Sequence, residues 1–215
     1  MNFANFTQIL SNYLTQNPLP GHEKIMQKIL PSRLNSKVLP NENTRRSAVL
    51  LMFYPKGDEI FLPLILRPQY DGVHGGQMAF PGGRVEFKDK DIQATALREA
   101  QEEIGIKATD VKVLTNLTEL FIPPSNLYCQ PVLGCLPYRP DFYPDEREVA
   151  GIFEVTIAEI LDPAIMQIRS IETRGQKFET PCFVIQNQVV WGATALMIAE
   201  LIEILKKMEY IQSNA

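Results

Sequence analysis

The chain has 215 residues, of which 45% are hydrophobic and 21% are charged, a composition typical of a globular protein. Its formal net charge of −4 argues against non-specific binding to nucleic acid, which depends on lysine and arginine side chains that neutralise phosphates. No apolar run approaches the ~20 residues that cross a membrane, and no basic segment precedes an apolar stretch at the N-terminus. The three cysteines are widely spaced and form no CxxC motif, so we expect no disulfide framework, no zinc site and a cytoplasmic location.

Residues 1–40 are predicted to form a helical extension to a main domain over residues 41–215. Apolar residues at helical spacing predict a first helix, which two prolines end, and a second short helix is expected over His22–Leu30. The extension either packs onto its own domain, the preferred interpretation, or meets a partner; a homodimer stays open. The residues expected to face inward are Phe3, Phe6, Ile9, Leu10, Tyr13, Ile25, Ile29 and Leu30.

The main domain alternates apolar segments with turn residues, which predicts a mixed β-sheet with helices on its faces. Its first two strands should form a hairpin, and a glycine-rich loop follows them. Trp191 is expected in the core. The predicted strands are Ser47–Tyr54, Glu59–Leu66, Gln77–Phe80, Val111–Phe121, Tyr128–Pro137, Glu148–Val155, Met166–Thr173 and Lys177–Ile185, with a helical turn at Ala158–Leu161 and a last helix over Ala193–Glu209.

The most informative stretch runs from Gly82 to Ile106 and combines a glycine turn, a polar loop and a helix dense in carboxylates. Glu99, Glu102 and Glu103 are spaced i, i+3, i+4, so they are neighbours on one helix surface. Gly105 stands where a left-handed helix cap is expected. The residues that form the apolar stripe of this helix are Ile92, Ala96, Leu97, Ala100 and Ile104.

Three adjacent carboxylates do not help a helix, because each close like-charged pair destabilises it by roughly 0.2–0.5 kcal/mol. Arg98 can pair with Glu102 at i+4, which leaves Glu99 and Glu103 facing each other. Mg²⁺ or Mn²⁺ would relieve this repulsion, since hard divalent cations prefer oxygen ligands. The alternative is a solvated acidic face without a metal.

The segment Arg98–Ile106 (REAQEEIGI) resembles the second half of the Nudix box, R-E-U-x-E-E-x-G-U, where U is apolar. The first half, G-x5-E-x7, departs from the pattern: Gly83 is followed by Asp89 in place of glutamate, and eight residues separate Asp89 from Arg98. The resemblance implies an α/β/α sandwich with a mixed sheet. It also implies that Glu99 and Glu103 are the first metal ligands and Glu102 the third, that Arg98 orients a glutamate, and that Gly83 lets the backbone approach the metal.

Upstream, Leu66–Gly83 looks like the signature of coenzyme A pyrophosphatases, L-L-[ST]-x-R-[SA]-x3-R-x3-G-x3-[FW]-P-G-G. Three positions depart: Leu64-Ile65 replaces the Leu-[ST] part, Pro68 replaces a small residue and Gly72 replaces the second arginine. The resemblance implies that a coenzyme A-like nucleotide binds near this segment. The candidate substrate-binding residues are Arg67, His74, Gly76 and Phe80.

The resulting hypothesis is metal-dependent hydrolysis of the diphosphate bond of coenzyme A or its derivatives. Glu102, Arg98 and Glu148 are the candidate catalytic residues, with Glu148 a general base from a loop opposite the helix or a solvated charge. Arg67 contacts phosphate or is solvated, and His74 acts as a base or phosphate donor. The alternatives are a Nudix pyrophosphatase for ADP-ribose, NADH or an oxidised nucleotide, and a Nudix-fold sensor that binds a nucleotide without hydrolysing it.

Overall fold

The computed structural model describes residues 1–29, 38–173 and 175–208. Its large sheet is built around β1 (Arg45–Lys56), which pairs in parallel with β7 (Leu127–Cys135) and antiparallel with β2 (Glu59–Leu66). The predicted hairpin of β1 and β2 is confirmed, with Tyr54 opposite Phe61. The remaining strands of this mixed sheet are β3 (Met78–Ala79) and β8 (Gly151–Thr156) on β2, β4 (Gly82–Arg84) on β1, and β5 (Lys112–Asn116) and β6 (Leu120–Ile122) on β7.

Strand β1 is buried on both faces, because successive side chains of a strand point to opposite sides of the sheet. Leu50 and Met52 belong to the hydrophobic cluster beneath α3 (Ile92–Ile104), whereas Leu51 and Phe53 belong to the cluster on the other face. The sequence of β1 is therefore a nearly continuous apolar run, as expected of a strand that is covered on both sides.

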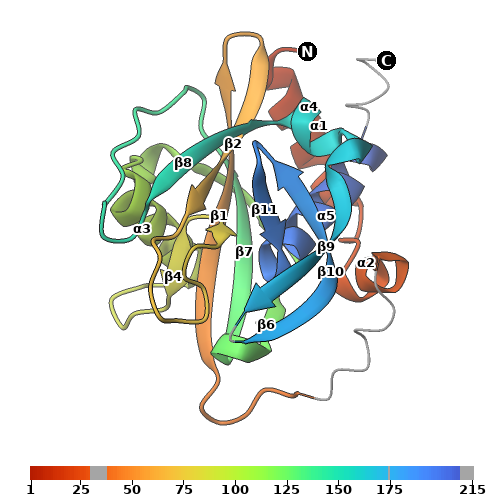
Figure 1. Ribbon diagram of the computed structural model, residues 1–215. Helices are drawn as coiled ribbons and strands as arrows, with labels where there is room; N and C mark the ends of the chain where they lie inside the picture. The colour runs from red at the N-terminus through yellow and green to blue at the C-terminus, as the bar shows by residue number, and fades with distance from the viewer. Residues whose placement is uncertain (30–37, 174, 209–215) are drawn as a thin grey trace.

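The helices lie in two layers on opposite sides of the sheet, with α3 on one side and α5 (Gly192–Lys207) on the other (Figure 1). The predicted apolar stripe of α3 is buried in or packed against the cluster on its side, and apolar residues of α5 are buried in the cluster on the other side. The α/β/α fold expected from the sequence is thus confirmed. Smaller elements complete it: α1 (Phe3–Gln16), α2 (His22–Ile29), α4 (Ile157–Leu161), and a second sheet of β9 (Met166–Thr173), β10 (Gln176–Ile185) and β11 (Gln188–Trp191).

The N-terminal helices share the hydrophobic cluster of α5. Phe6 is fully buried and packs edge to face on Phe53 of β1, with ring centroids 5.1 Å apart. On α2, His22 Nε2 lies 3.1 Å from a carboxylate oxygen of Glu200, a fully buried residue of α5. The described part of the extension therefore packs onto the main domain, while Leu30 and the side chain of Ile29 lie outside the described residues.

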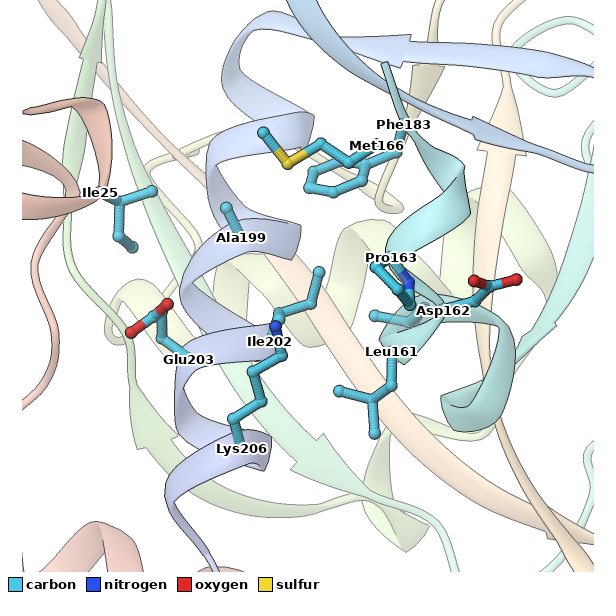
Figure 2. Close-up of a pocket in the computed structure, with 11 residues that line it drawn as sticks. Ile25, Leu161, Asp162, Pro163, Met166, Phe183, Ala199, Ile202, Glu203 and Lys206 are labelled. Carbon is cyan, nitrogen blue, oxygen red and sulfur yellow. The ribbon is translucent and has the colours of Figure 1, made fainter. Parts of the chain in front are cut away.

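A groove of about 270 Å³ lies between α2, α4 and α5, and Figure 2 shows the residues that line it. Ile25, Leu161, Met166 and Ile202 make its lining largely apolar, and Asp162, Glu203 and Lys206 carry the charges there. The groove belongs to the α5 side of the sheet and therefore lies away from the carboxylates of α3.

Several elements differ from their predicted boundaries. The expected strand over residues 111–121 is divided into β5 and β6, and a register shift between Val113 and Thr115 interrupts its pairing with β7. Glu148 lies in a turn before β8 rather than inside the strand. Trp191 is only partly buried and packs edge to face on Phe178, 5.9 Å between centroids. In the described residues, no helix is long and apolar enough to span a membrane.

Replacing Phe6 with alanine tests whether the N-terminal helix belongs to the cooperative core. The loss of a fully buried ring should lower the free energy of unfolding by about 3–5 kcal/mol, because a cavity is left against Phe53. Gln8→Ala, an exposed change on the same helix, should shift it by no more than about 0.5 kcal/mol. Urea denaturation followed by circular dichroism measures both. Equal stabilities for the two variants would mean that α1 unfolds independently of the sheet.

Candidate functional site

The orientation of the carboxylates depends on where α3 begins and ends. The Asp91 side chain accepts a hydrogen bond from Ala94 N at 2.7 Å and caps the first turn. Gly105 ends the helix with φ +73°, and its N–H donates to Gln101 O at 3.0 Å. The Gly105 cap agrees with the sequence prediction. The helix is thereby held in a rotation that directs Glu99 and Glu103 towards the glycine turn.

Glu103 is the most deeply buried of the three glutamates, with a side chain only 1% exposed. Gly82 N donates to Glu103 Oε2 at 2.7 Å, and Arg67 Nη2 lies 3.6 Å from Glu103 Oε1. Burial raises the pKa of Glu103 to about 7, against the opposing effects of the Arg67 charge and the Gly82 N–H. A carboxylate in this position is costly unless further positive charge reaches it.

Glu99 faces the same turn one helical turn earlier, and its side chain is 13% exposed. A Cβ atom built on Gly83 would lie 2.4 Å from the carboxyl group of Glu99, so only glycine fits there without displacing that group. Burial raises the pKa of Glu99, and the negative charges of Glu102 and Glu148 add to this effect. Glu99 and Glu103 thus form a partly enclosed, electron-rich pair beside the backbone of the turn.

Arg98 connects the helix to the preceding loop through its whole guanidinium group. Nε and Nη2 donate to the two oxygens of Asp89 at 2.8 and 3.0 Å, and Nη1 donates to Glu99 and Glu102 at 2.9 Å each. Nη2 also donates to the backbone oxygen of Arg84 at 3.0 Å. Glu102 is 51% exposed and also lies 3.5 Å from Lys88 Nζ. The three glutamates therefore divide into an inward pair, Glu99 and Glu103, and the outward Glu102, which pairs with Arg98 as its i+4 spacing predicted.

Asp89 has a structural role in this arrangement. Besides Arg98, it accepts hydrogen bonds from Glu86 N at 2.9 Å and Thr95 Oγ1 at 2.8 Å. The Arg98 guanidinium, with these two donors, holds the pKa of Asp89 well below its usual range. The sequence left open whether Asp89 is a functional acid; its oxygens are occupied in closing the loop onto α3.

The loop that carries Glu148 is docked on the C-terminal end of α3. Tyr143 N donates to Ile104 O and Asp145 N donates to Glu103 O, both at 3.0 Å, and Glu148 N donates to Asp145 O at 2.9 Å. Glu148 is itself exposed, and its charge contributes to the raised pKa values of both inward glutamates. The loop that carries this solvent-accessible carboxylate is therefore attached to the end of α3, whereas the sequence analysis expected it opposite the helix.

The four predicted substrate-binding residues have different surroundings. Arg67 donates to Gly82 O at 3.0 Å and faces Glu103, a role that the sequence did not reveal. His74 Nδ1 lies 3.2 Å from Gln77 Oε1 within the loop, and Gly76 adopts φ +67°. Phe80 is 1% exposed in the hydrophobic core. Its ring is buried by packing, so we do not retain Phe80 as a substrate contact.

The donor set suits a hard divalent cation. Glu99 and Glu103 offer carboxylate oxygens, and Gly83 keeps the adjoining backbone free of a side chain. In the parts of the chain that the structure describes, no three His, Cys, Asp or Glu side chains are grouped closely enough to hold a metal ion by themselves. Glu99 and Glu103 are therefore the carboxylates that could hold such an ion, as a pair rather than as part of a larger cluster.

The fold and site together define an α/β/α protein whose central helix presents carboxylates beside a glycine turn. The NUDIX domain model matches residues 43–170, and the chain belongs to this family. It is 38% identical over 161 residues to a Photorhabdus laumondii protein named "Uncharacterized Nudix hydrolase NudL", covering 75% of this chain and 85% of the relative.

Two solved structures share the fold. A Nudix hydrolase from M. smegmatis, RenU, has a TM-score of 0.53 at 18% identity, covering 76% of this chain and 86% of its own. A C. elegans Ap4A hydrolase binary complex has a TM-score of 0.50 at 15% identity, covering 80% and 99%. At these identities the comparison supports the architecture only, and the family assignment rests on the sequence matches.

Asp89→Asn should destabilise the protein in a pH-dependent way. At pH 7 we expect a loss of about 1.5–3 kcal/mol, the usual contribution of a hydrogen bond to a charged group. Because folding lowers the pKa of Asp89, its carboxylate stabilises the fold fully above the ordinary value of 3.8, and this stabilisation is lost as the pH falls below it. Urea denaturation at pH 7 and pH 3 should show the difference between wild type and variant shrinking in acid. A difference independent of pH would contradict the assignment.

Proposed function

We propose that the protein hydrolyses the diphosphate bond of coenzyme A or its derivatives, giving 4′-phosphopantetheine, or its acyl form, and adenosine 3′,5′-bisphosphate. The observation that carries this proposal is the placement of the Leu66–Gly83 signature segment directly against the glutamates of α3, through Arg67, Gly82 and Gly83. The family match and the hydrolase relatives make this chain a Nudix hydrolase of the pyrophosphatase type.

In the proposed reaction, the inward pair Glu99 and Glu103 binds Mg²⁺ or Mn²⁺. Such an ion, when bound, neutralises the anionic diphosphate and lowers the pKa of water. Glu102 is proposed as the outer member of the group, since Arg98 and Lys88 already hold it towards solvent. Arg98 keeps Glu99 in place through Nη1. Gly83 lets the backbone approach the carboxylates without a steric conflict.

Glu148 is the proposed general base. Its loop is hydrogen-bonded to the end of α3, which holds the carboxylate near the inward pair, and its exposure leaves it accessible to water. A base must lie within hydrogen-bond reach of the proton that it removes, directly or through one water. Its charge also disfavours ionisation of Glu99 and Glu103, a repulsion that a bound cation would relieve.

A different nucleoside diphosphate derivative, such as ADP-ribose, NADH or an oxidised nucleotide, is the second candidate substrate. The specific observation that favours it is Gly72, which stands where the coenzyme A signature has a second arginine. A non-hydrolysing sensor is the less favoured alternative, since Arg98 and all three glutamates of the box are present. For location we propose the cytoplasm, because Cys129, Cys135 and Cys182 are all free and buried.

Paired substitutions separate the ligand from the base. Glu103→Gln preserves the shape of the side chain but removes its charge, so Mn²⁺ affinity and kcat should both fall, the latter by about 100-fold or more. Glu148→Gln should lower kcat by about 100-fold, the usual contribution of a general base, and leave Mn²⁺ affinity nearly unchanged. Glu146→Gln, an exposed neighbour, is the control. Wild-type turnover by Glu103→Gln in the presence of Mg²⁺ would exclude Glu103 as a ligand.

The substrate proposal is tested by comparing kcat/KM for coenzyme A, acetyl-coenzyme A, ADP-ribose, NADH and oxidised dGTP at saturating Mg²⁺. We expect coenzyme A or its thioester to be preferred by at least about tenfold, which corresponds to about 1.4 kcal/mol of transition-state binding. Product identification by mass spectrometry locates the bond that is cleaved. A preference for ADP-ribose, NADH or oxidised dGTP would reject the coenzyme A assignment, and removal of Mg²⁺ by EDTA should abolish turnover of every substrate.

A further inference from the structure

Arg67 begins the substrate-signature loop, but its guanidinium group is directed towards the helix glutamates. Nη2 donates to Gly82 O at 3.0 Å and lies 3.6 Å from Glu103 Oε1. Gly82 N in turn donates to Glu103 Oε2 at 2.7 Å. The backbone of Gly82 is therefore linked to Glu103 through its N–H and to Arg67 through its carbonyl oxygen, on the two peptide groups that flank its Cα, so the three residues form a closed set of polar contacts.

The position of Gly82 is restricted from its other side by the central strand. Gly82 pairs with Val49 of β1, and a Cβ atom on Gly82 would lie 2.3 Å from Ala48 O and 2.5 Å from Val49 Cα. The residue also adopts φ +157°. The backbone of Gly82, whose N–H orients Glu103, therefore has little freedom, because β1 lies close on one side and Arg67 on the other.

We propose that Arg67 is a positioning residue for the proposed metal ligand Glu103. It acts through the backbone of Gly82 and through the Glu103 carboxylate rather than through the substrate. This inference rests on the proposed role of Glu103 in metal binding. It assigns to Arg67 a task other than the phosphate contact that the sequence suggests. It also links the loop that begins at Arg67 to the catalytic helix, since Arg67 N donates to Gln77 O at 3.0 Å across the base of that loop.

An arginine suits this task better than a lysine. The planar guanidinium group carries five N–H donors in a fixed arrangement, so one side chain can serve a carbonyl and a carboxylate in neighbouring positions. The side chain of Arg67 is 23% exposed, so water competes little for these donors. A lysine ammonium keeps the charge as a single point and reproduces the two contacts less well.

The test compares Arg67→Gln and Arg67→Lys with wild type by Mn²⁺ titration of the substrate-free protein, followed by the EPR signal of free Mn²⁺. Partners that orient a metal ligand typically contribute 10–100-fold to metal affinity, so Arg67→Gln should weaken Mn²⁺ binding by at least about tenfold. Arg67→Lys should recover part of the loss. In steady-state assays at saturating Mn²⁺, kcat should fall while KM changes less than about twofold. Arg46→Gln removes an exposed arginine, ion-paired with Glu119 at 2.6 Å, and should match wild type in every readout.

A KM effect with unchanged Mn²⁺ affinity would overturn the inference and return Arg67 to substrate binding. Circular dichroism and thermal melting establish that each variant is folded; if Arg67→Gln does not fold, Arg67→Lys decides alone, and wild-type Mn²⁺ affinity in it would contradict the proposal. The Mn²⁺ measurement needs no substrate, so a wild-type protein that binds Mn²⁺ but ignores coenzyme A would reject only the substrate assignment. A wild-type protein that does not bind Mn²⁺ would overturn the inference itself.

Discussion

The burial of the Glu103 carboxylate against the Gly82 peptide is the constraint on which the site depends. Taking a carboxylate out of water is unfavourable, and here a backbone N–H and one nearby arginine offset only part of that cost, so the pKa rises to about 7. A protein selected only for stability would place an apolar residue at this position. The proposed metal-binding role of Glu103 would explain why this carboxyl group is kept, and Glu99, whose pKa burial also raises, shares that proposed role.

Arg98 solves a related problem on the outer surface of the same helix. It pairs with Asp89 through two hydrogen bonds and also donates to Glu99 and Glu102. The positive charge of one guanidinium group therefore offsets the repulsion among these three carboxylates. Asp89 is one methylene shorter than the glutamate of the usual box, and the loop before α3 is one residue longer. Asp89 nevertheless accepts hydrogen bonds from both Nε and Nη2 of Arg98.

Local patterns predicted most of the fold, since the α3 stripe, its Gly105 cap and the β1–β2 hairpin each depend on neighbouring residues. The features that were not predicted are those that depend on contacts between segments distant in the sequence. The register shift beside Val113 depends on the pairing with β7, and Glu148 was assigned to a strand although hydrogen bonds to the end of α3 hold its loop. The i+4 spacing separated Glu102, paired with Arg98, from Glu99 and Glu103, but the packing of those two against Gly82 and Gly83 depends on a contact that spacing does not reveal. The sequence left Arg67 as either a phosphate contact or a solvated side chain, and its contact with Glu103, 36 positions away in the chain, was not predicted because no periodicity reveals it.

The loop that contains Gly72 and Gly75 is the segment on which the proposed specificity for a coenzyme A-like substrate would depend. Gly72 replaces the second arginine of the coenzyme A signature, and its neighbourhood is occupied by the ring of Tyr70, whose Cε2 would lie 2.3 Å from a Cβ at position 72. Gly75 has equally little room, because a Cβ there would lie 2.4 Å from Tyr70 O. The loop is thus compact around Tyr70, and an arginine at position 72 would have to displace its exposed ring. Since Arg67 is already engaged with Glu103, anionic groups of the substrate beyond the diphosphate meet fewer arginines here than the signature provides.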